Sequence, residues 1–160
     1  MTNFMIRFYD ARQAVKDGKP LTAIDYLIMS VSDPLVHCEA YFVKDNESFS
    51  ASMRGERKGC GWADIQYSHP RRWIDIPFEL TEPQLDRAYN RARDLDGAPY
   101  DTIGVASLKS GIIKENPDKY WCSEVCAELV KAALLLGDDF IPSTFSPNGL
   151  FFELYRRFMQ

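Results

Sequence analysis

The sequence lacks an excess of positive charge. Its 19 lysines and arginines are outnumbered by 23 aspartates and glutamates, which gives a net charge of −4 at pH 7. Binding to nucleic acid depends on a basic face that displaces counterions from the phosphates. The small basic groups, Arg54, Arg57 and Lys58 in one place and Arg71 and Arg72 in another, are interpreted as solvated loop charges. We therefore expect no nucleic acid among the partners of this protein.

Long hydrophobic runs are also missing. No apolar segment approaches the roughly 20 residues that a membrane-spanning helix needs, and Met1–Asp10 lacks the basic-then-apolar pattern of a secretory signal. The expected location is the cytoplasm, with no membrane span. The composition, 46% hydrophobic and 26% charged, is that of an ordinary globular protein. Without an internal repeat or a linker, 160 residues predict a single domain over residues 1–160.

Histidine and cysteine are scarce. There are two histidines and four cysteines, and the cysteines are Cys38, Cys60, Cys122 and Cys126. A cytoplasmic protein keeps its thiols reduced, so free thiols are expected instead of disulfides. The C-x-x-C pairs and paired histidines of structural zinc sites do not occur in the sequence. We expect no metal and no cofactor.

Alternating and aromatic-rich segments predict five strands. They are, in order, Phe4–Tyr9, Val36–Val43, Ser48–Met53, Gly61–Gln66 and Arg72–Phe78. The polar turn Lys44–Glu47 predicts that the second and third strands form a hairpin.

Helical periodicity and capping signals predict the helices. They are Leu21–Ser30, one that begins after Leu80, Asp101–Lys109, Cys122–Leu136 and one from Ser146–Pro147 to about Phe158. In the second helix Thr81 and Gln84 form a capping box, and Gly97 suits its C-terminal end. Gly137 is the expected stop of the fourth. Strands grouped ahead of helices indicate an α+β fold, with an antiparallel sheet packed against helices.

Cys122 stands at the start of a predicted helix. The partial positive charge and free N–H groups at a helix N-terminus stabilise a thiolate, and the same N–H groups can hold an oxyanion. A buried cysteine beside a tryptophan is also a common small hydrophobic residue of a core. The local sequence leaves both interpretations open. Cys126, one turn further along, is assigned to the core.

His37 lies in the middle of a predicted strand, and Glu39 shares its face because side chains alternate along a strand. A thiolate nucleophile needs a base, and the base needs a third group to orient it. The alternative is a strand histidine that hydrogen-bonds a backbone carbonyl. His69, before Pro70 in a loop, is the fallback base. Asp101 is expected to cap the helix that follows it.

The motifs resemble those of the permuted NlpC-type branch of the papain-like cysteine peptidases and amidases, which includes small bacterial and phage-encoded hydrolases. The matching segments are His37-Cys38-Glu39, Gly97-Ala98-Pro99-Tyr100-Asp101-Thr102-Ile103-Gly104, Trp121-Cys122-Ser123-Glu124 and Ser146-Pro147. In the papain arrangement the cysteine helix precedes the histidine strand, whereas here the histidine strand comes first. The resemblance spans about Phe4–Leu154 and implies a permuted papain-like fold.

For the site, the resemblance implies Cys122 as the nucleophile and His37 as its base. In related proteins a polar side chain orients the imidazole, and we name Glu39 first and Ser52 second for this role. Because residues two apart on one strand are about 7 Å from each other, the alternative place for Glu39 is the wall of the substrate groove. The secondary candidates for substrate binding are Tyr100, Asp101 and Ser123.

The expected reaction is attack of the thiolate on an amide bond, first of all in a cell-wall-type peptide, followed by hydrolysis of the acyl-enzyme. The same scaffold also hosts lipid acyltransferases related to lecithin:retinol acyltransferase. Acyl transfer or thioesterase chemistry on a lipid is therefore the second expectation, and a non-catalytic binding module is the third. The expected partner is a peptide or acyl substrate, and the sequence leaves the oligomeric state open.

Overall fold

Five strands form one antiparallel sheet in the computed structural model, which describes residues 1–53, 58–64, 69–110 and 116–159. The strands are β1 (Phe4–Asp10), β2 (Leu35–Phe42), β3 (Glu47–Ser52), β4 (Gly59–Asp64) and β5 (Trp73–Phe78). Their order in the sheet is β4-β3-β2-β1-β5, and every neighbouring pair is antiparallel. All five predicted strands are present, although Ile65 and Gln66 of the fourth lie outside the described residues.

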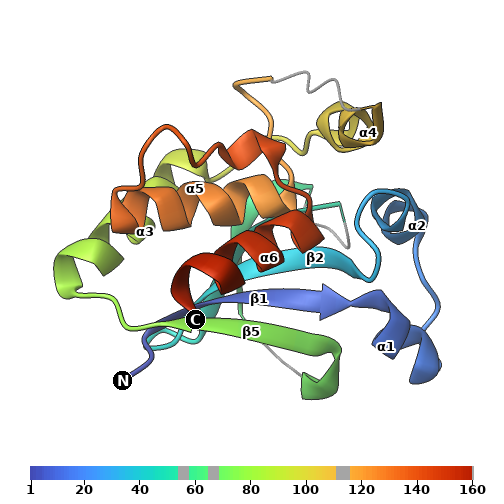
Figure 1. Ribbon diagram of the computed structural model, residues 1–160, viewed down its shortest axis with the longest axis horizontal. Helices are drawn as coiled ribbons and strands as arrows, with labels where there is room; N and C mark the ends of the chain where they lie inside the picture. The colour runs from blue at the N-terminus through green and yellow to red at the C-terminus, as the bar shows by residue number, and fades with distance from the viewer. Residues whose placement is uncertain (54–57, 65–68, 111–115, 160) are drawn as a thin grey trace.

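Helices pack against this sheet, so the α+β expectation is confirmed. They are α1 (Ala11–Lys16), α2 (Ala23–Met29), α3 (Glu82–Leu95), α4 (Thr102–Ser110), α5 (Cys122–Leu134) and α6 (Pro147–Phe158), with short 3-10 turns η1 (Pro70–Arg72) and η2 (Pro142–Thr144). Figure 1 shows α3, α5 and α6 gathered on one side of β1, β2 and β5. Among the residues described, no helix has the length and apolar character needed to cross a membrane.

The core lies between the sheet and helices α5 and α6. On β1 the alternating side chains of Phe4, Ile6 and Phe8 are fully buried, as period-two patterning predicts. Leu150 and Leu154 of α6 are equally buried. Burying a side chain of this size contributes about 1.5–3 kcal/mol, so these few contacts fix α6 on the sheet.

Local signals explain where most helices begin and end. In α3 the backbone N–H of Thr81 donates to Gln84 Oε1 at 2.8 Å, which is the predicted capping box. Gly97, just after this helix, has a φ of +83°. The prediction that Gly137 ends α5 is wrong. The exposed Leu135 adopts the left-handed conformation itself, and the N–H of Leu136 then reaches back to the carbonyl of Lys131.

Candidate active site

Cys122 is the first residue of α5, and a short parallel bridge fixes the chain just before it. The N–H of Tyr120 donates to the carbonyl of Pro99 at 3.1 Å, and the N–H of Asp101 donates to the carbonyl of Tyr120 at 3.0 Å. The bridge sets where α5 starts. It therefore places the Cys122 side chain beside the N–H groups of the first helical turn.

The sulfur of Cys122 reaches β2 where the pairing between β2 and β3 stops. That ladder ends at the pair Ala40 and Phe49. Two residues before Ala40, the backbone groups of Cys38 that face β3 have partners outside the ladder. Its carbonyl accepts from Ser50 Oγ at 2.6 Å, and its N–H donates to the Cys122 thiolate. The end of the ladder thus leaves room for a sulfur atom to act as a strand partner.

His37 joins the thiol to a carboxylate. Its side chain is 6% exposed, and its Nε2 lies 3.2 Å from Glu39 Oε1. The imidazole also lies next to the Cys122 sulfur. The ring meets Trp73 edge-on, with 6.4 Å between the ring centres. Although residues His37 and Glu39 are two apart on one strand, their side chains lean together, so the structure brings Cys122, His37 and Glu39 into one chain of contacts.

These contacts favour a thiolate at Cys122. A hydrogen bond from the Cys38 thiol, a hydrogen bond from His37 and the Cys38 N–H lower the pKa of Cys122 well below its ordinary value, although burial acts in the opposite direction. The other thiols behave differently. Burial raises the pKa of Cys38 and Cys126, and it raises that of Cys60 to about 12. Cys122 is therefore the one of the four thiols whose surroundings favour the thiolate form.

A cavity of about 220 Å³ opens next to His37. Its lining residues are Tyr9, Lys19, Thr22, Asp25, His37, Glu39, Ser52 and Trp73. Three of the predicted site residues, His37, Glu39 and Ser52, are thus together in one cavity. Cys122 is not among the lining residues and exposes only 1% of its surface. His37 therefore lines the cavity and contacts the thiolate, while the sulfur itself is covered.

The register of the sheet explains how the cavity wall forms. Tyr9 of β1 pairs with His37 of β2 and with Trp73 of β5, so the three side chains form a row on one face of the sheet. The rings of Tyr9 and Trp73 meet edge-on with centres 5.2 Å apart. Lys19 Nζ lies 5.2 Å from the centre of the Tyr9 ring and adds a cation to the wall.

Arg7 occupies the next row on the same face. It pairs in register with Glu39 on one side and Asp75 on the other. Its Nε and Nη2 donate to the two carboxylate oxygens of Asp75 at 2.6 and 3.1 Å, and its guanidinium lies 5.7 Å from the ring centres of Tyr41 and Trp73. Arg7 thus holds a fixed positive charge beside Glu39.

The chain matches no family model, no curated protein and no solved structure. Function is therefore inferred from the site itself and from the motif resemblance. In the part of the chain that the structure describes, no three or more His, Cys, Asp or Glu side chains form a group that could hold a metal ion.

The secondary candidates from the sequence have structural contacts and do not line the cavity. Ser123 is fully buried, and its Oγ donates to the carbonyl of Phe145 at 2.7 Å. Asp101 caps α4 as expected, because its Oδ1 accepts from the N–H of Gly104 at 2.8 Å. Tyr100, which is largely buried, forms the bridge with Tyr120 described above. These contacts hold α4 and α5 in place around Cys122.

His69, the fallback base, lies away from the cavity, and the cavity contains residues that were not predicted from the sequence. His69 is exposed and precedes η1, as a loop histidine should, and it does not line the cavity. Sequence reasoning missed Tyr9 and Trp73, because only the strand register brings them to His37. Asp25 was also missed, although the capping box it forms with Thr22 at the start of α2 is visible in the sequence.

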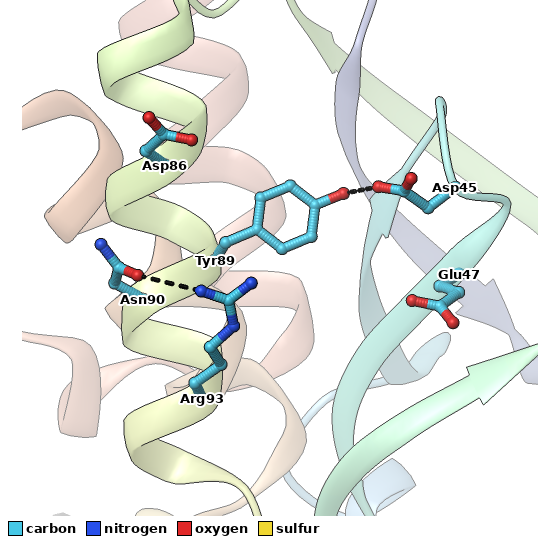
Figure 2. Close-up of a pocket in the computed structure, with 6 residues that line it drawn as sticks. All are labelled: Asp45, Glu47, Asp86, Tyr89, Asn90 and Arg93. Carbon is cyan, nitrogen blue, oxygen red and sulfur yellow. Dashed lines mark hydrogen bonds between the residues drawn. The ribbon is translucent and has the colours of Figure 1, made fainter.

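A second, larger cavity lies away from these residues. It has a volume of about 620 Å³ and is lined by Asp45, Glu47, Asp86, Tyr89, Asn90 and Arg93. Figure 2 shows the Tyr89 hydroxyl pointing at the Asp45 carboxylate, to which it donates a hydrogen bond, while Arg93 donates to Asn90. Neither a cysteine nor a histidine is among the residues that line this cavity, so it contains none of the site residues predicted from the sequence.

Proposed function

We propose that this protein is a cysteine hydrolase that cleaves an amide bond in a peptide, with Cys122 as the nucleophile and His37 as the base. The observation that carries the proposal is the position of His37, whose side chain lies next to the Cys122 sulfur on one side and 3.2 Å from Glu39 on the other. A nucleophile, a base and an orienting carboxylate in contact form the general arrangement of a catalytic triad.

The arrangement of elements supports a permuted papain-like fold of the NlpC type. The histidine strand β2 lies in the middle of the antiparallel sheet, and the cysteine is the first residue of α5. Helix α5 packs against this strand, and residues of both elements belong to the same core cluster. A nucleophile at a helix N-terminus opposite a histidine strand is what the motif resemblance implies.

The reaction follows from these positions. The Cys122 thiolate attacks the carbonyl carbon, and the electron pair of the C=O bond moves to oxygen, where the first N–H groups of α5 stabilise the negative charge. Collapse of this intermediate breaks the C–N bond, and protonated His37 gives its proton to the leaving nitrogen. Water that loses a proton to His37 then attacks the thioester, which releases the carboxylic acid and restores the thiolate.

Glu39 is proposed as the residue that positions the imidazole. Its carboxylate accepts from Nε2 of His37, which leaves Nδ1 as the ring nitrogen for proton transfer. Glu39 also lines the cavity, so the two roles considered for it from the sequence are compatible. Ser52, which lines the same cavity, is proposed as a contact for substrate.

Access to the sulfur is part of the proposal. Attack requires the carbonyl carbon to approach the sulfur to about 3–3.5 Å, and Cys122 exposes 1% of its surface. A local opening that takes place in the free protein must therefore uncover the sulfur toward the cavity that His37 already lines. Enzyme sites commonly close and open by such local movements.

The character of the cavity favours a peptide over a lipid acyl chain. Its volume of about 220 Å³ is small, and Lys19, Asp25 and Glu39 place charged groups in its wall. Ligand sites for small molecules are usually larger, on the order of 300–1,000 Å³, so this cavity has little room for a long acyl chain. By fold-level analogy, a cell-wall-type peptide is the first substrate to test.

The test is the pH dependence of Cys122 alkylation by iodoacetamide, followed residue by residue with mass spectrometry. We expect Cys122 to react fastest of the four cysteines, with an apparent pKa well below the ordinary value of about 8.5, and His37→Ala to abolish the reaction at low pH. His69→Ala is the matched control and should leave the profile unchanged. Slow labelling of Cys122 that is the same in both variants would refute the proposal and favour a binding module.

A further inference from the structure

Three cysteines meet in the core between β2 and α5. The Cys38 side chain lies next to the side chains of both Cys122 and Cys126 in the core cluster where α5 packs on β2, and each of the three is buried and free of any disulfide. The hydrolytic reaction uses only Cys122. A cluster of reduced thiols around a stabilised thiolate has chemistry of its own, because a thiolate is the form of cysteine that reacts with peroxides.

Geometry disfavours one pair within the cluster. Cys122 and Cys126 are one helical turn apart, and side chains in that relation have Cβ atoms about 5–6 Å apart. A disulfide needs Cβ atoms about 3.5–4.5 Å apart, so a bond within α5 would require the helix to distort. Cys38 comes from the facing strand and is free of that restriction. Its thiol already contacts the sulfur of Cys122.

We propose that Cys38 and Cys122 form a peroxide-reactive pair, in which a hydroperoxide oxidises Cys122 and Cys38 then closes a Cys38–Cys122 disulfide. In the first step the thiolate attacks the terminal oxygen of the hydroperoxide, the O–O bond breaks, and Cys122 becomes a sulfenic acid while an alcohol, or water, leaves. In the second step the sulfur of Cys38 displaces the hydroxyl of the sulfenic acid. The thiol proton of Cys38 and this hydroxyl leave together as water.

A small oxidant suits the surroundings of this pair. Cys122 exposes 1% of its surface and Cys38 none, which disfavours bulky disulfides as oxidants and favours hydrogen peroxide. The disulfide would protect Cys122 from irreversible oxidation to the sulfinic acid, and a dithiol would restore both thiols. If Cys122 is the nucleophile of the hydrolase, which is the proposed function, the bond also switches hydrolysis off reversibly.

The test treats the full chain with a small molar excess of hydrogen peroxide, blocks the remaining thiols and maps linked peptides by mass spectrometry. We expect one intramolecular bond between Cys38 and Cys122 that dithiothreitol reverses. Cys126→Ser, the matched control, should still form it. Cys38→Ser should lose it and carry sulfinic acid at Cys122. Any other linkage, or none, in the native protein overturns the inference, and this result stands even if Cys38→Ser fails to fold.

The outcome is independent of the test for the hydrolase. His37-dependent alkylation of Cys122 without a Cys38–Cys122 bond would leave the proposed function standing and refute the peroxide-reactive pair. A Cys38–Cys122 bond in a protein whose Cys122 alkylates without any help from His37 would support the pair and refute the hydrolase.

Discussion

The four thiols of this protein differ in their neighbours more than in their burial. Cys60 is 5% exposed and Cys122 1%, yet the pKa of Cys60 is raised to about 12 by burial and by the nearby charges of Glu124 and Asp96. Burial disfavours a thiolate at both positions. What distinguishes Cys122 is a set of hydrogen-bond donors, from the thiol and N–H of Cys38 and from the side chain of His37.

The orienting role of Glu39 gives a first prediction. Glu39→Gln keeps the size of the side chain and removes the charge that supports a protonated imidazole, so the low-pH alkylation rate of Cys122 should fall about ten- to a hundredfold, less than a typical loss of a general base. Alkylation reactions quenched at set times, at several pH values, measure the rate at Cys122. Ser52→Ala, a change in the same cavity, should leave the alkylation rate unchanged, and an equal effect of both changes would contradict the role of Glu39.

Cys60 makes the fold sensitive to alkaline pH. Its folded-state pKa of about 12 lies above the unfolded value of about 8.5, so its contribution to stability is complete below pH about 8.5 and is lost as the pH rises toward 12. Cys60→Ser should make the alkaline fall in the free energy of unfolding less steep. Urea titrations across that pH window measure the slope. Part of the slope remains in the variant, because the pKa values of Cys38 and Cys126 are raised too.

Among the elements, those with strong local signals are the ones that the sequence allows to be predicted. Alternating side chains locate β1, and the capping box at Thr81 locates the start of α3. Helix α1 was not predicted, because it follows β1 directly and its six residues are too few to show a helical period, although Asp10 is its N-cap. The early end of α5 was missed for a similar reason, since nothing in the residue type of Leu135 favours the left-handed conformation.

The site shows the same division between local and long-range information. Cys122, His37 and Glu39 are identified by motif and by strand periodicity, which are local. Trp73 reaches His37 only through the pairing of β5 with β1, and register is decided by the whole sheet. The Cys38 contact with Cys122 depends on where the β2–β3 ladder ends, which no short stretch of sequence specifies.

The fit between α4 and α5 gives a prediction at the level of elements. A Cβ atom on Gly104 of α4 would overlap the ring of Trp121 and the carboxylate of Asp101, and overpacking of this kind costs about 1–3 kcal/mol. Gly104→Ala should therefore lower the free energy of unfolding by that amount, measured by urea denaturation. Gly137→Ala is the control, because its Cβ would meet only the end of the Asp139 side chain, at 3.1 Å. A neutral Gly104→Ala would contradict this close approach.

At the scale of the whole molecule, α6, near the C-terminal end of the described residues, packs against β1, the first strand. Phe151 of α6 meets the ring of Phe8 of β1 edge-on, with 5.4 Å between centres, and Phe158 meets Phe78 of β5 at 5.5 Å. Core contacts between segments so far apart in sequence make unfolding cooperative, because neither segment keeps its buried surface without the other.

The packing of α6 against the sheet leads to a prediction about stability. Leu154→Ala removes a fully buried side chain of α6 and should cost about 2–5 kcal/mol through lost burial and a residual cavity. Phe152→Ala, on the same helix but 64% exposed, should change stability by less than about 0.5 kcal/mol. Thermal denaturation followed by circular dichroism compares the two. Equal shifts of the melting temperature would contradict the packing of α6 on the sheet.

The sulfur that takes the place of a strand partner for Cys38 has a spectroscopic consequence. The amide proton of Cys38 faces the Cys122 sulfur, whose charge changes when Cys122 ionises. The neighbouring strand amides instead donate hydrogen bonds to carbonyls, whose charge does not change. In a nitrogen-15 NMR spectrum, the chemical shift of this one amide therefore follows the titration of a thiol that has no resonance of its own in that spectrum. The chemical shift of the Cys38 amide thus reports the ionisation of the candidate nucleophile.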